Sequence, residues 1–379
     1  MPATYDLAVV GAGIVGLAHA LAAVRRGKRV VVIDRDAQAN GASIRNFGFV
    51  TVTGQERGQT WRRAMRSRDV WLEVAAKAGI AVEHEGLAVI GRRPEAVPVL
   101  EAFMATEMGE GCELLDAAAV RARFPMLQPE LISAGLWSPH DRRVESRQAI
   151  PLLAAWLVEA HGVTFLRQTQ VTAVAPPRLE TSVGLIEAEA AIVCPGDDLL
   201  ALFPERIAAY GVRKCKLHML RVAPPSLGWR LPGSVMTDLS LVRYSGYSDL
   251  PEAAPLLARL QREQGEHLAH GVHLIAVQSA DGSLVIGDSH HYGETLDPFA
   301  PQAVDDLILS EYCATIAPEP PRVLERWTGV YSSSGRVMFC DKPSDSVRLV
   351  MVTSGTGAST AFAIGEETIA DLYGAGGMS

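Results

Sequence analysis

The first 34 residues contain the pattern that most restricts the fold. A short apolar run, Asp6 to Val10, is followed by the glycine turn Gly11 to Gly16 (GAGIVG) and by an alanine- and leucine-rich stretch with helical spacing that stops at Gly27. A second apolar run, Arg29 to Ile33, ends on an aspartate. Apolar runs of this length are typical of buried parallel strands, and glycine commonly follows the last turn of a helix. The pattern predicts a βαβ unit with a right-handed crossover.

This glycine turn, in its strand–turn–helix context, predicts a dinucleotide site. Gly11 makes the tight turn, Gly13 lets the backbone approach a pyrophosphate, and Gly16 allows the helix to pack closely on the strand. The amides of the first helical turn face the anion, where the helix dipole favours negative charge. Asp34 is placed to accept hydrogen bonds from ribose hydroxyls, and its carboxylate disfavours the 2′-phosphate of NADP. The alternative is a glycine-rich turn without a ligand, and this unit alone does not distinguish FAD from NAD.

Three later segments favour FAD. Residues 41–48 form a small-residue segment that can supply amides and the Asn46 side chain to an extended cofactor. The strand 190–194 ends in Pro195-Gly196, which suits a second approach to the adenosine half. The glycine loop 354–360 opens the last helix, whose N-terminal amides can stabilise negative charge on a reduced isoalloxazine. Each loop taken alone can be merely structural, but their order and spacing together favour FAD.

The rest of the chain alternates between helical and β-rich segments, without an internal repeat or a low-complexity linker. The fold class predicted is α/β, a Rossmann-like FAD-binding domain with an inserted, mainly antiparallel β-sheet substrate domain of α+β type. The expected FAD-binding domain comprises residues 1–85, 140–212 and 325–379, and the substrate domain residues 86–139 and 213–324. Helices are predicted at 57–78, 94–108, 116–124, 146–160, 256–266, 301–317 and 360–373. β structure is predicted at 80–90, 135–138, 163–166, 170–174, 179–189, 190–193, 219–222, 235–244, 272–286 and 347–353.

Composition and charge exclude several classes of function. The net charge of -8 argues against a nucleic-acid binder, although a few local Arg or Lys residues can still bind an anionic substrate. The five cysteines are far apart, so we expect no disulfide framework and no metal site. No stretch has the uninterrupted apolar length of a membrane span, and Leu7 to Ala23 is expected to be a strand and helix rather than a signal peptide. We therefore expect a cytoplasmic protein.

Taken together, these segments resemble the D-amino-acid oxidase family of flavoproteins, and within it the glycine oxidase and sarcosine oxidase branch. The resemblance covers essentially the whole chain, and its most specific parts are the N-terminal glycine turn, the run at 45–48 (RNFG) and the loop at 354–357 (SGTG). The resemblance implies a bound FAD, with Val171 contacting adenine through its backbone. The FAD contacts predicted in this way are Gly11, Gly13, Ile14, Val15, Gly16, Asp34, Arg35, Ser43, Arg45, Asn46, Gly48, Val171, Gly196, Gly355, Thr356, Gly357, Ala358, Ser359 and Thr360.

The run at 287–292 (GDSHHY), together with 45–48, resembles a narrower bacterial subgroup associated with phosphonate catabolism and N-alkylated 2-aminoethylphosphonates. Two positions depart from the wider family. Gly329 stands near the position where the sarcosine branch attaches FAD through a cysteine, so a non-covalent FAD is predicted. Tyr331 stands where the glycine oxidase branch has the arginine that holds the substrate carboxylate, which puts a simple α-amino acid in doubt.

The resemblance implies oxidation of a small anionic amine, with hydride transfer from its α-carbon to flavin N5. The resulting imine hydrolyses, and molecular oxygen is the expected acceptor, giving H2O2. No catalytic residue is assigned, because the flavin performs the difficult step. The hydroxyls from Tyr331 to Ser334, together with Arg336, can satisfy a phosphonate, although an ordinary hairpin turn is the alternative. The predicted substrate-binding residues are Arg45, Arg243, Tyr244, His290, Tyr331, Ser332 and Arg336.

Other functions stay open from the sequence. One is a glycine, sarcosine or D-amino-acid oxidase that acts on a carboxylate substrate. Another is a tRNA-modifying protein or an FAD-binding module without turnover, although the acidic balance of the chain counts against tRNA. The N-substituent, the electron acceptor and the oligomeric state are not determined by the sequence.

Overall fold

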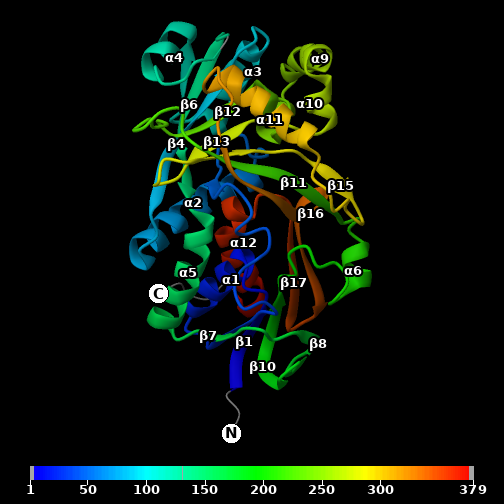
Figure 1. Ribbon diagram of the computed structural model, residues 1–379. Coiled ribbons are helices and arrows are strands. Elements are labelled where there is room, and N and C mark those ends of the chain that lie inside the picture. Colours follow the sequence, from blue (N-terminus) through cyan, green and yellow to red (C-terminus); the bar gives the residue numbers. More distant parts are fainter. Residues whose placement is uncertain (1–3, 130, 375–379) are drawn as a thin grey trace.

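A parallel sheet forms the lower half of the molecule in Figure 1, a computed structural model that describes residues 4–129 and 131–374. Its strand order is β7-β2-β1-β10-β17, with each neighbouring pair parallel. An antiparallel extension, β8 and β9, continues from β10. The strands are β1 (Thr4–Val10), β2 (Val30–Ile33), β7 (Thr164–Leu166), β8 (Val171–Ala175), β9 (Arg178–Thr181), β10 (Gly184–Val193) and β17 (Val347–Ser354).

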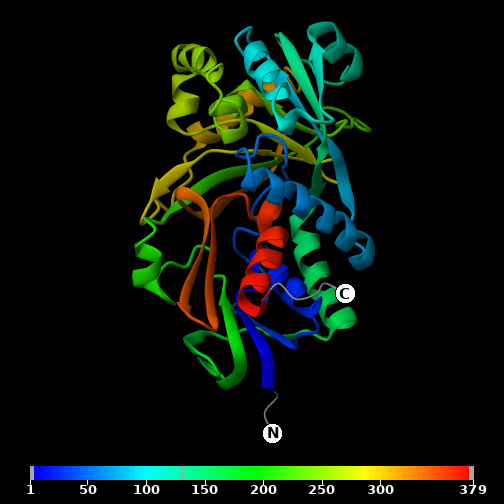
Figure 2. The same cartoon turned by 180° about the vertical axis from the view of Figure 1, so that it is seen from behind.

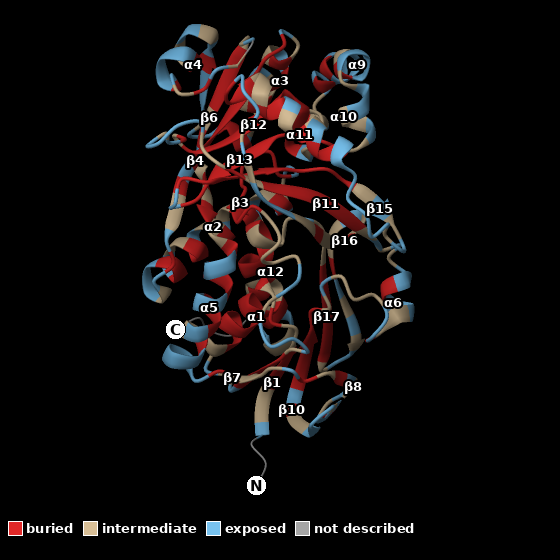
Figure 3. Cartoon of the chain, in the orientation of Figure 1, coloured by how far each residue is buried: buried red, intermediate tan, exposed pale blue. Residues whose placement is uncertain are grey.

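Strand β1 is apolar along its length because both faces of this sheet are covered. Leu7 and Val9 pack on one side among residues of the helices, whereas Ala8 packs on the other side with Val31 and Leu349. Figures 2 and 3 show the helices over the sheet and the buried strands beneath them. The helices that contribute to this core are α1 (Ile14–Val24), α2 (Gln59–Ala78), α5 (Ser146–His161) and α12 (Gly357–Tyr373).

A second sheet, mainly antiparallel, forms the upper half of the molecule (Figure 1). It runs β11-β14-β13-β12-β4-β6-β5, and only the β12–β4 pair in this series is parallel. The strand β15 continues along β11 beyond β14, and β3 pairs with β6. The strands are β3 (Phe49–Val50), β4 (Val82–Gly91), β5 (Glu113–Asp116), β6 (Ala134–Val144), β11 (Arg213–Val222), β12 (Ser234–Thr237), β13 (Ile275–Gln278), β14 (Leu284–Gly287) and β15 (His291–Gly293).

One long strand, β16 (Val323–Ser344), belongs to both sheets. Its first half pairs with β11, from Val323 to Ser333, and its second half pairs with β17, as far as Ser344. The remaining helices lie mostly around the upper sheet. They are α3 (Ala96–Met104), α4 (Ala117–Arg123), α6 (Pro204–Ala208), α7 (Asp238–Leu241), α8 (Ser245–Ser248), α9 (Ala253–Glu263), α10 (Gly265–Ala269) and α11 (Gln302–Thr315), with a 3-10 turn at Glu107–Gly109.

The predicted fold class is confirmed, but two local predictions are wrong. The β run expected at 235–244 ends at Thr237, because Asp238 begins the short helix α7. The second is the hairpin turn considered as an alternative at 331–334: these residues belong to β16, and residues 331–333 pair with β11. The exact domain boundaries stay a prediction. Among the described residues, no helix combines the length and apolar character that crossing a membrane requires.

Close packing of α1 on α12 generates a stability prediction. A Cβ at Gly365 would lie 2.8 Å from the Ala18 carbonyl oxygen, so Gly365→Ala must push two helix backbones apart. We expect it to lower the free energy of unfolding by about 1–3 kcal/mol, measured by thermal or urea unfolding. The control is Gly265→Ala, where a Cβ meets no atom within 4 Å and no loss is expected. Equal stability of the two variants would contradict the packing argument.

Candidate active site

A cavity of about 570 Å³ lies where the two sheets meet. Its lining includes the carboxyl ends of β1, β2 and β10, at Val10, Ile33 and Val193, and residues of the upper sheet such as Leu217 and Ile275. In parallel sheets, ligands bind outside the carboxyl ends of strands where neighbouring strands connect in opposite directions. The pair β1 and β10 is such a point, because β1 continues to β2 on its other side. The volume is typical of small-molecule sites.

The glycine turn at the end of β1 tolerates no side chains at two of its positions. A Cβ on Gly11, whose φ is +103°, would lie 2.4 Å from the carbonyl oxygen of Cys194 on the neighbouring chain segment. A Cβ on Gly16 would lie 1.9 Å from the Gly11 carbonyl oxygen. The turn is therefore as tight as the sequence predicted, and it leaves backbone surface facing the cavity.

Two side chains hold this turn against its neighbours. Asp34 accepts the Ala12 amide through Oδ2 at 2.6 Å and the Asp36 amide through Oδ1 at 2.9 Å. Ser43 Oγ accepts the amide of Ile14, the first residue of α1, at 2.9 Å. Both side chains line the cavity, so each can shape the turn and still contact a ligand. The remaining first-turn amides of α1 lack helical acceptors and can bind an anion.

The loop before β3 has a more structural role than the sequence predicted. Asn46 donates through Nδ2 to the Ala42 carbonyl at 2.6 Å, and its Oδ1 accepts from the Gly48 amide at 2.6 Å and from Ser146 Oγ at 2.9 Å. Asn46 therefore ties the loop together while lining the cavity. Gly48 lies outside the cavity lining. It is needed for packing, because a Cβ there would lie 1.7 Å from the Val144 carbonyl oxygen.

The C-terminal glycine loop enters the cavity from the end of β17. Gly355 has a φ of +73°, and a Cβ at this position would lie 3.3 Å from the ring of Tyr331. Helix α12 begins at Gly357, so its first amides lie at the cavity wall. Thr360 was expected to contact FAD, but it is buried inside α12, lies outside the cavity lining and donates to the Thr356 carbonyl at 2.9 Å.

Arg243 brings a positive charge to the part of the cavity formed by the upper sheet, close to several tyrosines. Its Nη2 donates to the hydroxyl of Tyr292 at 3.2 Å. Burial works against the charge of Arg243, but Tyr292, Tyr331 and Asp288 raise its pKa above the ordinary value. Burial also raises the pKa of Tyr244 and Tyr331, so both keep their hydroxyl protons. This end of the cavity therefore offers a cation and hydroxyl donors to an anion.

Asp288, His273 and His290 form a buried cluster in the same wall, called here the His–Asp–His cluster. Asp288 Oδ1 lies 3.0 Å from His273 Nε2, and Oδ2 lies 3.7 Å from His290 Nε2. Burial lowers the pKa of His273, and it lowers that of His290 to about 3. Burial opposes the charge of Asp288, but the His273 ring and the positive charge of Arg243 hold its pKa below the usual value. Near neutral pH the carboxylate is charged and both rings are neutral.

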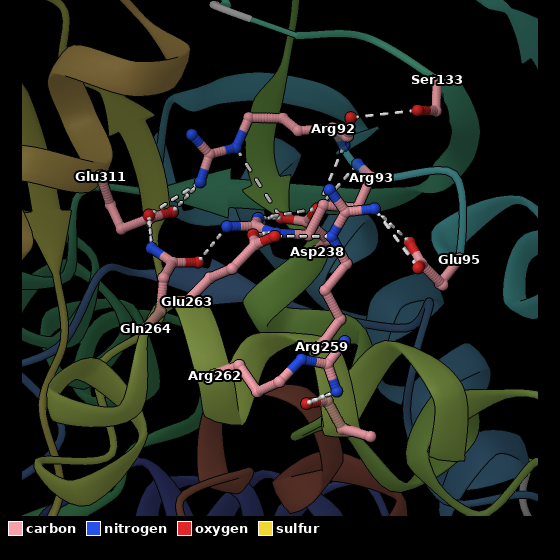
Figure 4. A network of polar contacts seen from close by, with 11 residues as sticks. Arg92, Arg93, Glu95, Ser133, Asp238, Arg259, Arg262, Glu263, Gln264 and Glu311 are labelled. Atoms are coloured by element: carbon pink, nitrogen blue, oxygen red, sulfur yellow. Dashed lines mark hydrogen bonds and ion pairs between the residues drawn. The ribbon is translucent and has the colours of Figure 1, made fainter.

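A buried network of charges anchors α7, the helix that comes just before Arg243 (Figure 4). Asp238 Oδ2 accepts the backbone amides of Arg92 and Arg93, both at 3.2 Å, and the guanidinium of Arg93 contacts both carboxylate oxygens at 3.1 Å. From the anchored helix, Ser240 Oγ lies 3.1 Å from His273 Nδ1, and the Ser240 carbonyl accepts the Arg243 amide at 3.2 Å. The network thereby positions two groups of the cavity wall.

Most of the predicted site residues meet in this one cavity, and a few do not. Arg336 is exposed, outside the cavity lining, with its guanidinium 5.7 Å from the centre of the Tyr210 ring, so the structure does not bring it together with the other predicted substrate residues. Ser332 lines the cavity, but its hydroxyl donates to the Gly196 carbonyl at 2.7 Å. The predicted residues that line the cavity are Gly11, Gly13, Ile14, Val15, Gly16, Asp34, Arg35, Ser43, Arg45, Asn46, Val171, Gly196, Arg243, Tyr244, His290, Tyr331, Ser332, Gly355, Thr356, Gly357, Ala358 and Ser359.

Sequence reasoning missed His273, Asp288 and Tyr292 as parts of the site. Asp288 and Tyr292 lie in the 287–292 run, of which only His290 was predicted to bind the substrate. His273 stands in a β-rich segment with no motif around it. Side-chain atoms of His273, Asp288 and His290 lie within 4.8 Å of one another, so the fold assembles possible metal ligands that sequence spacing did not reveal. His291, next to His290, is not part of the cavity lining.

The cavity fits the expected FAD in several ways. The glycine turn brings bare backbone to the cavity wall, two helices begin at this wall, and the cavity volume suits a small-molecule ligand. A family model described as FAD dependent oxidoreductase matches residues 6–372. The chain belongs to this family. Its cofactor is FAD, and it is an oxidoreductase.

Solved structures show the same fold at low sequence identity. Glycine oxidase from Bacillus cereus ATCC 14579 is 17% identical with a TM-score of 0.77, covering 99% of this chain and 96% of that one. L-proline dehydrogenase from P. horikoshii is 18% identical with a TM-score of 0.79, covering 100% and 95%. L-alpha-glycerophosphate oxidase from Mycoplasma pneumoniae, solved with FAD bound, is 15% identical with a TM-score of 0.75, covering 98% and 95%. No curated protein sequence matches the chain.

The Gly11 contact predicts how the chain binds FAD. We expect Gly11→Ala to weaken FAD binding by about tenfold or more, because overpacking of 1–3 kcal/mol falls on the turn that meets the pyrophosphate. The measurement is the dissociation constant of FAD for the apoprotein, followed by flavin fluorescence. Gly27→Ala is the matched control, since Gly27 also has a positive φ but no atom within 4 Å of a Cβ. Equal loss in both variants would show a general folding defect instead.

The cavity lining also predicts non-covalent FAD. Cys194 is the one cysteine among the described lining residues, and it lies against the glycine turn, where burial raises the pKa of its thiol. A buried protonated thiol is a poor nucleophile. Precipitation with trichloroacetic acid is therefore expected to leave all the flavin in the supernatant. A yellow pellet would contradict this prediction.

Proposed function

We propose that the protein oxidises the CH–NH bond of a small amine that carries an anionic group, plausible candidates being N-alkylated 2-aminoethylphosphonates. The observation that carries this proposal is Arg243, a cation held in the cavity wall among Tyr244, Tyr292 and Tyr331. A half-buried guanidinium in a cavity wall is stabilised by an anion or strong acceptors, and a substrate head group supplies both. The likeness of the fold to a glycine oxidase and a proline dehydrogenase supports an amine donor.

The residues of this chain have a limited set of tasks in such a reaction. FAD, held by the glycine turn after β1 and by the first amides of α1 and α12, would supply the acceptor for a hydride from the substrate α-carbon. Arg243 orients the anionic group, and the tyrosine rings enclose the substrate and exclude water. The amine loses two electrons and two protons, as a hydride from carbon and a proton from nitrogen, and becomes an imine, which water hydrolyses to a carbonyl compound and a free amine. We propose molecular oxygen as the acceptor, reduced by the same two electrons to hydrogen peroxide.

The structure changes which donors would hold a phosphonate. The hydroxyl of Ser332 is already used by the Gly196 carbonyl, and Arg336 lies outside the cavity lining. Arg243 with the hydroxyls of Tyr292 and Tyr331 is the donor set that lines the cavity. Three donors match the three oxygens of a phosphonate, whereas the planar fork of an arginine also suits a carboxylate. The second candidate is therefore glycine- or sarcosine-type oxidation of a carboxylate substrate.

A substrate panel tests the proposed function. N-methyl-2-aminoethylphosphonate, sarcosine, glycine and glycerol phosphate would each be mixed anaerobically with the purified holoprotein, and bleaching of the flavin would be recorded. Peroxide and reduction of an artificial acceptor would then be measured in air. Bleaching by an anionic amine supports the proposal, and the phosphonate and sarcosine results separate the two candidates. Bleaching by glycerol phosphate alone would overturn it.

Arg243→Met then tests how the anion is held. We expect the KM for the best anionic amine to rise about ten- to a hundredfold, because a charged hydrogen bond contributes about 1.5–3 kcal/mol. The maximal rate of flavin bleaching should change less, since Arg243 does not touch the reacting bond in this proposal. Arg336→Met is the matched control, because that arginine is exposed and lies outside the cavity lining. An unchanged KM in Arg243→Met would reject this role.

A further inference from the structure

The side chain of His290 has one ring nitrogen whose protonation the fold determines. Nδ1 lies 2.9 Å from the carbonyl oxygen of Gly271. A carbonyl oxygen only accepts hydrogen bonds, so Nδ1 carries the proton. The ring is neutral, because burial lowers its pKa to about 3. Nε2 therefore holds a bare lone pair, and it faces Asp288 Oδ2 at 3.7 Å. Two acceptors face each other without a proton between them.

Asp288 has a second unsatisfied atom. Its Oδ1 is buried and, among the described residues, has no hydrogen-bond donor in good alignment, although His273 Nε2 lies 3.0 Å away. The nearby cation, Arg243, directs its hydrogen bond to the Tyr292 hydroxyl instead. A buried carboxylate without aligned donors is costly, and such atoms usually have a ligand or an ion as partner. The His–Asp–His cluster thus lacks a cationic donor on its cavity side.

Resting on the proposed function, we infer that Asp288 and His290 receive the substrate nitrogen as an ammonium group, with one N–H donated to Asp288 Oδ2 and one to His290 Nε2. The two acceptors lie in the same cavity wall as Arg243. The wall therefore carries an anion-binding cation beside a cation-binding acceptor pair. This combination matches a small zwitterion, with its negative group at Arg243 and its nitrogen at the acceptor pair.

A monovalent ammonium suits this wall better than a divalent metal ion. The three side chains are close enough to ligate a metal. However, the positive charge of Arg243 acts on both Asp288 and His290. It repels any cation bound there, and it repels a divalent metal ion about twice as strongly as an ammonium group. Ser240 Oγ lies 3.1 Å from His273 Nδ1 and can donate a hydrogen bond to that nitrogen. The proton of the neutral His273 ring is then on Nε2, which lies on the side of Asp288. Because the contact of Nε2 with Asp288 Oδ1 is poorly aligned, His273 positions the carboxylate without replacing the donor that the carboxylate lacks.

The inference predicts a dependence on the number of N–H groups. A secondary ammonium has two N–H groups for the two acceptors, a tertiary ammonium has one, and a quaternary ammonium has none. We expect each lost N–H to weaken binding about tenfold or more, since a charged hydrogen bond contributes about 1.5–3 kcal/mol. The series is N-methyl-, N,N-dimethyl- and N,N,N-trimethyl-2-aminoethylphosphonate, with sarcosine, dimethylglycine and glycine betaine in parallel. Binding would be measured from the shift that each ligand causes in the flavin absorption of the holoprotein.

The variant Asp288→Asn tests whether the methylation series weakens binding through lost hydrogen bonds to Asp288 or through the larger size of the methylated ligands. Asn keeps the shape of the side chain but removes its charge, so the variant should lose at least tenfold in affinity for the N-methyl compounds and respond less steeply to methylation. Ethylphosphonate and propionate, which lack the amine, should bind the variant as they bind the wild type. His291→Gln is the matched control, because His291 is the neighbouring histidine and lies outside the cavity lining. The methylation series in the wild type needs no variant, so it tests the inference even if Asp288→Asn fails to fold.

The outcomes distinguish this inference from the proposed function. Unchanged amine affinity in Asp288→Asn, equal loss for the amine-free anions, or equal binding across the methylation series overturns the inference. If anionic amines still bleach the wild-type flavin, the proposed function stands without it. If the amines bind with the expected N–H dependence but none bleaches the flavin, the proposed function fails and the binding site stands. If each purified chain carries about one divalent ion, and if removing that ion with EDTA abolishes amine binding, the His–Asp–His cluster binds a metal ion and not an ammonium group.

Discussion

The hydrogen-bond ladder of β16 is the constraint on which the geometry of the site depends. One continuous strand pairs with β11 as far as Ser333 and with β17 beyond it. Tyr331 therefore belongs to the upper sheet, yet its ring lies against Gly355, in the glycine loop after β17. Backbone hydrogen bonds, rather than a flexible linker, place the upper wall of the cavity, which includes Tyr331, against the glycine loop after β17. A site held in this way is already organised before the substrate arrives.

The charge network around Asp238 positions two more residues of the cavity wall, Arg243 and His273. Buried ion pairs contribute little net stability, because removing two charges from water offsets much of their attraction. Their value here is positional. Asp238 fixes the start of α7, Ser240 contacts His273, and the chain leaves the helix at Arg243. The cation and one part of the His–Asp–His cluster are thus positioned by the same buried carboxylate.

The position of the cation explains how this chain differs from what its family likeness suggests. The resemblance placed the substrate arginine on the strand where Tyr331 stands, and a tyrosine there left the anion without a partner. The fold supplies the cation from another element, at Arg243 after α7. Glycine oxidase, L-proline dehydrogenase and L-alpha-glycerophosphate oxidase share the fold at 15–18% identity, and a common fold leaves the side chains of a cavity wall free to differ.

The sequence by itself determined the cofactor side. Gly11, Gly16 and Asp34 act through local backbone geometry within the N-terminal βαβ unit, and the 354–360 loop does so at the turn from β17 to α12, so spacing along the chain carries the information. Local pattern did not reveal that 331–334 is paired strand, nor that Asn46 and Gly48 hold a loop. Only the tertiary structure decided the substrate side, because His273, Asp288 and Arg243 come from separate segments and meet through sheet pairing and α7. Their protonation depends on burial and on each other, which no spacing in the sequence records.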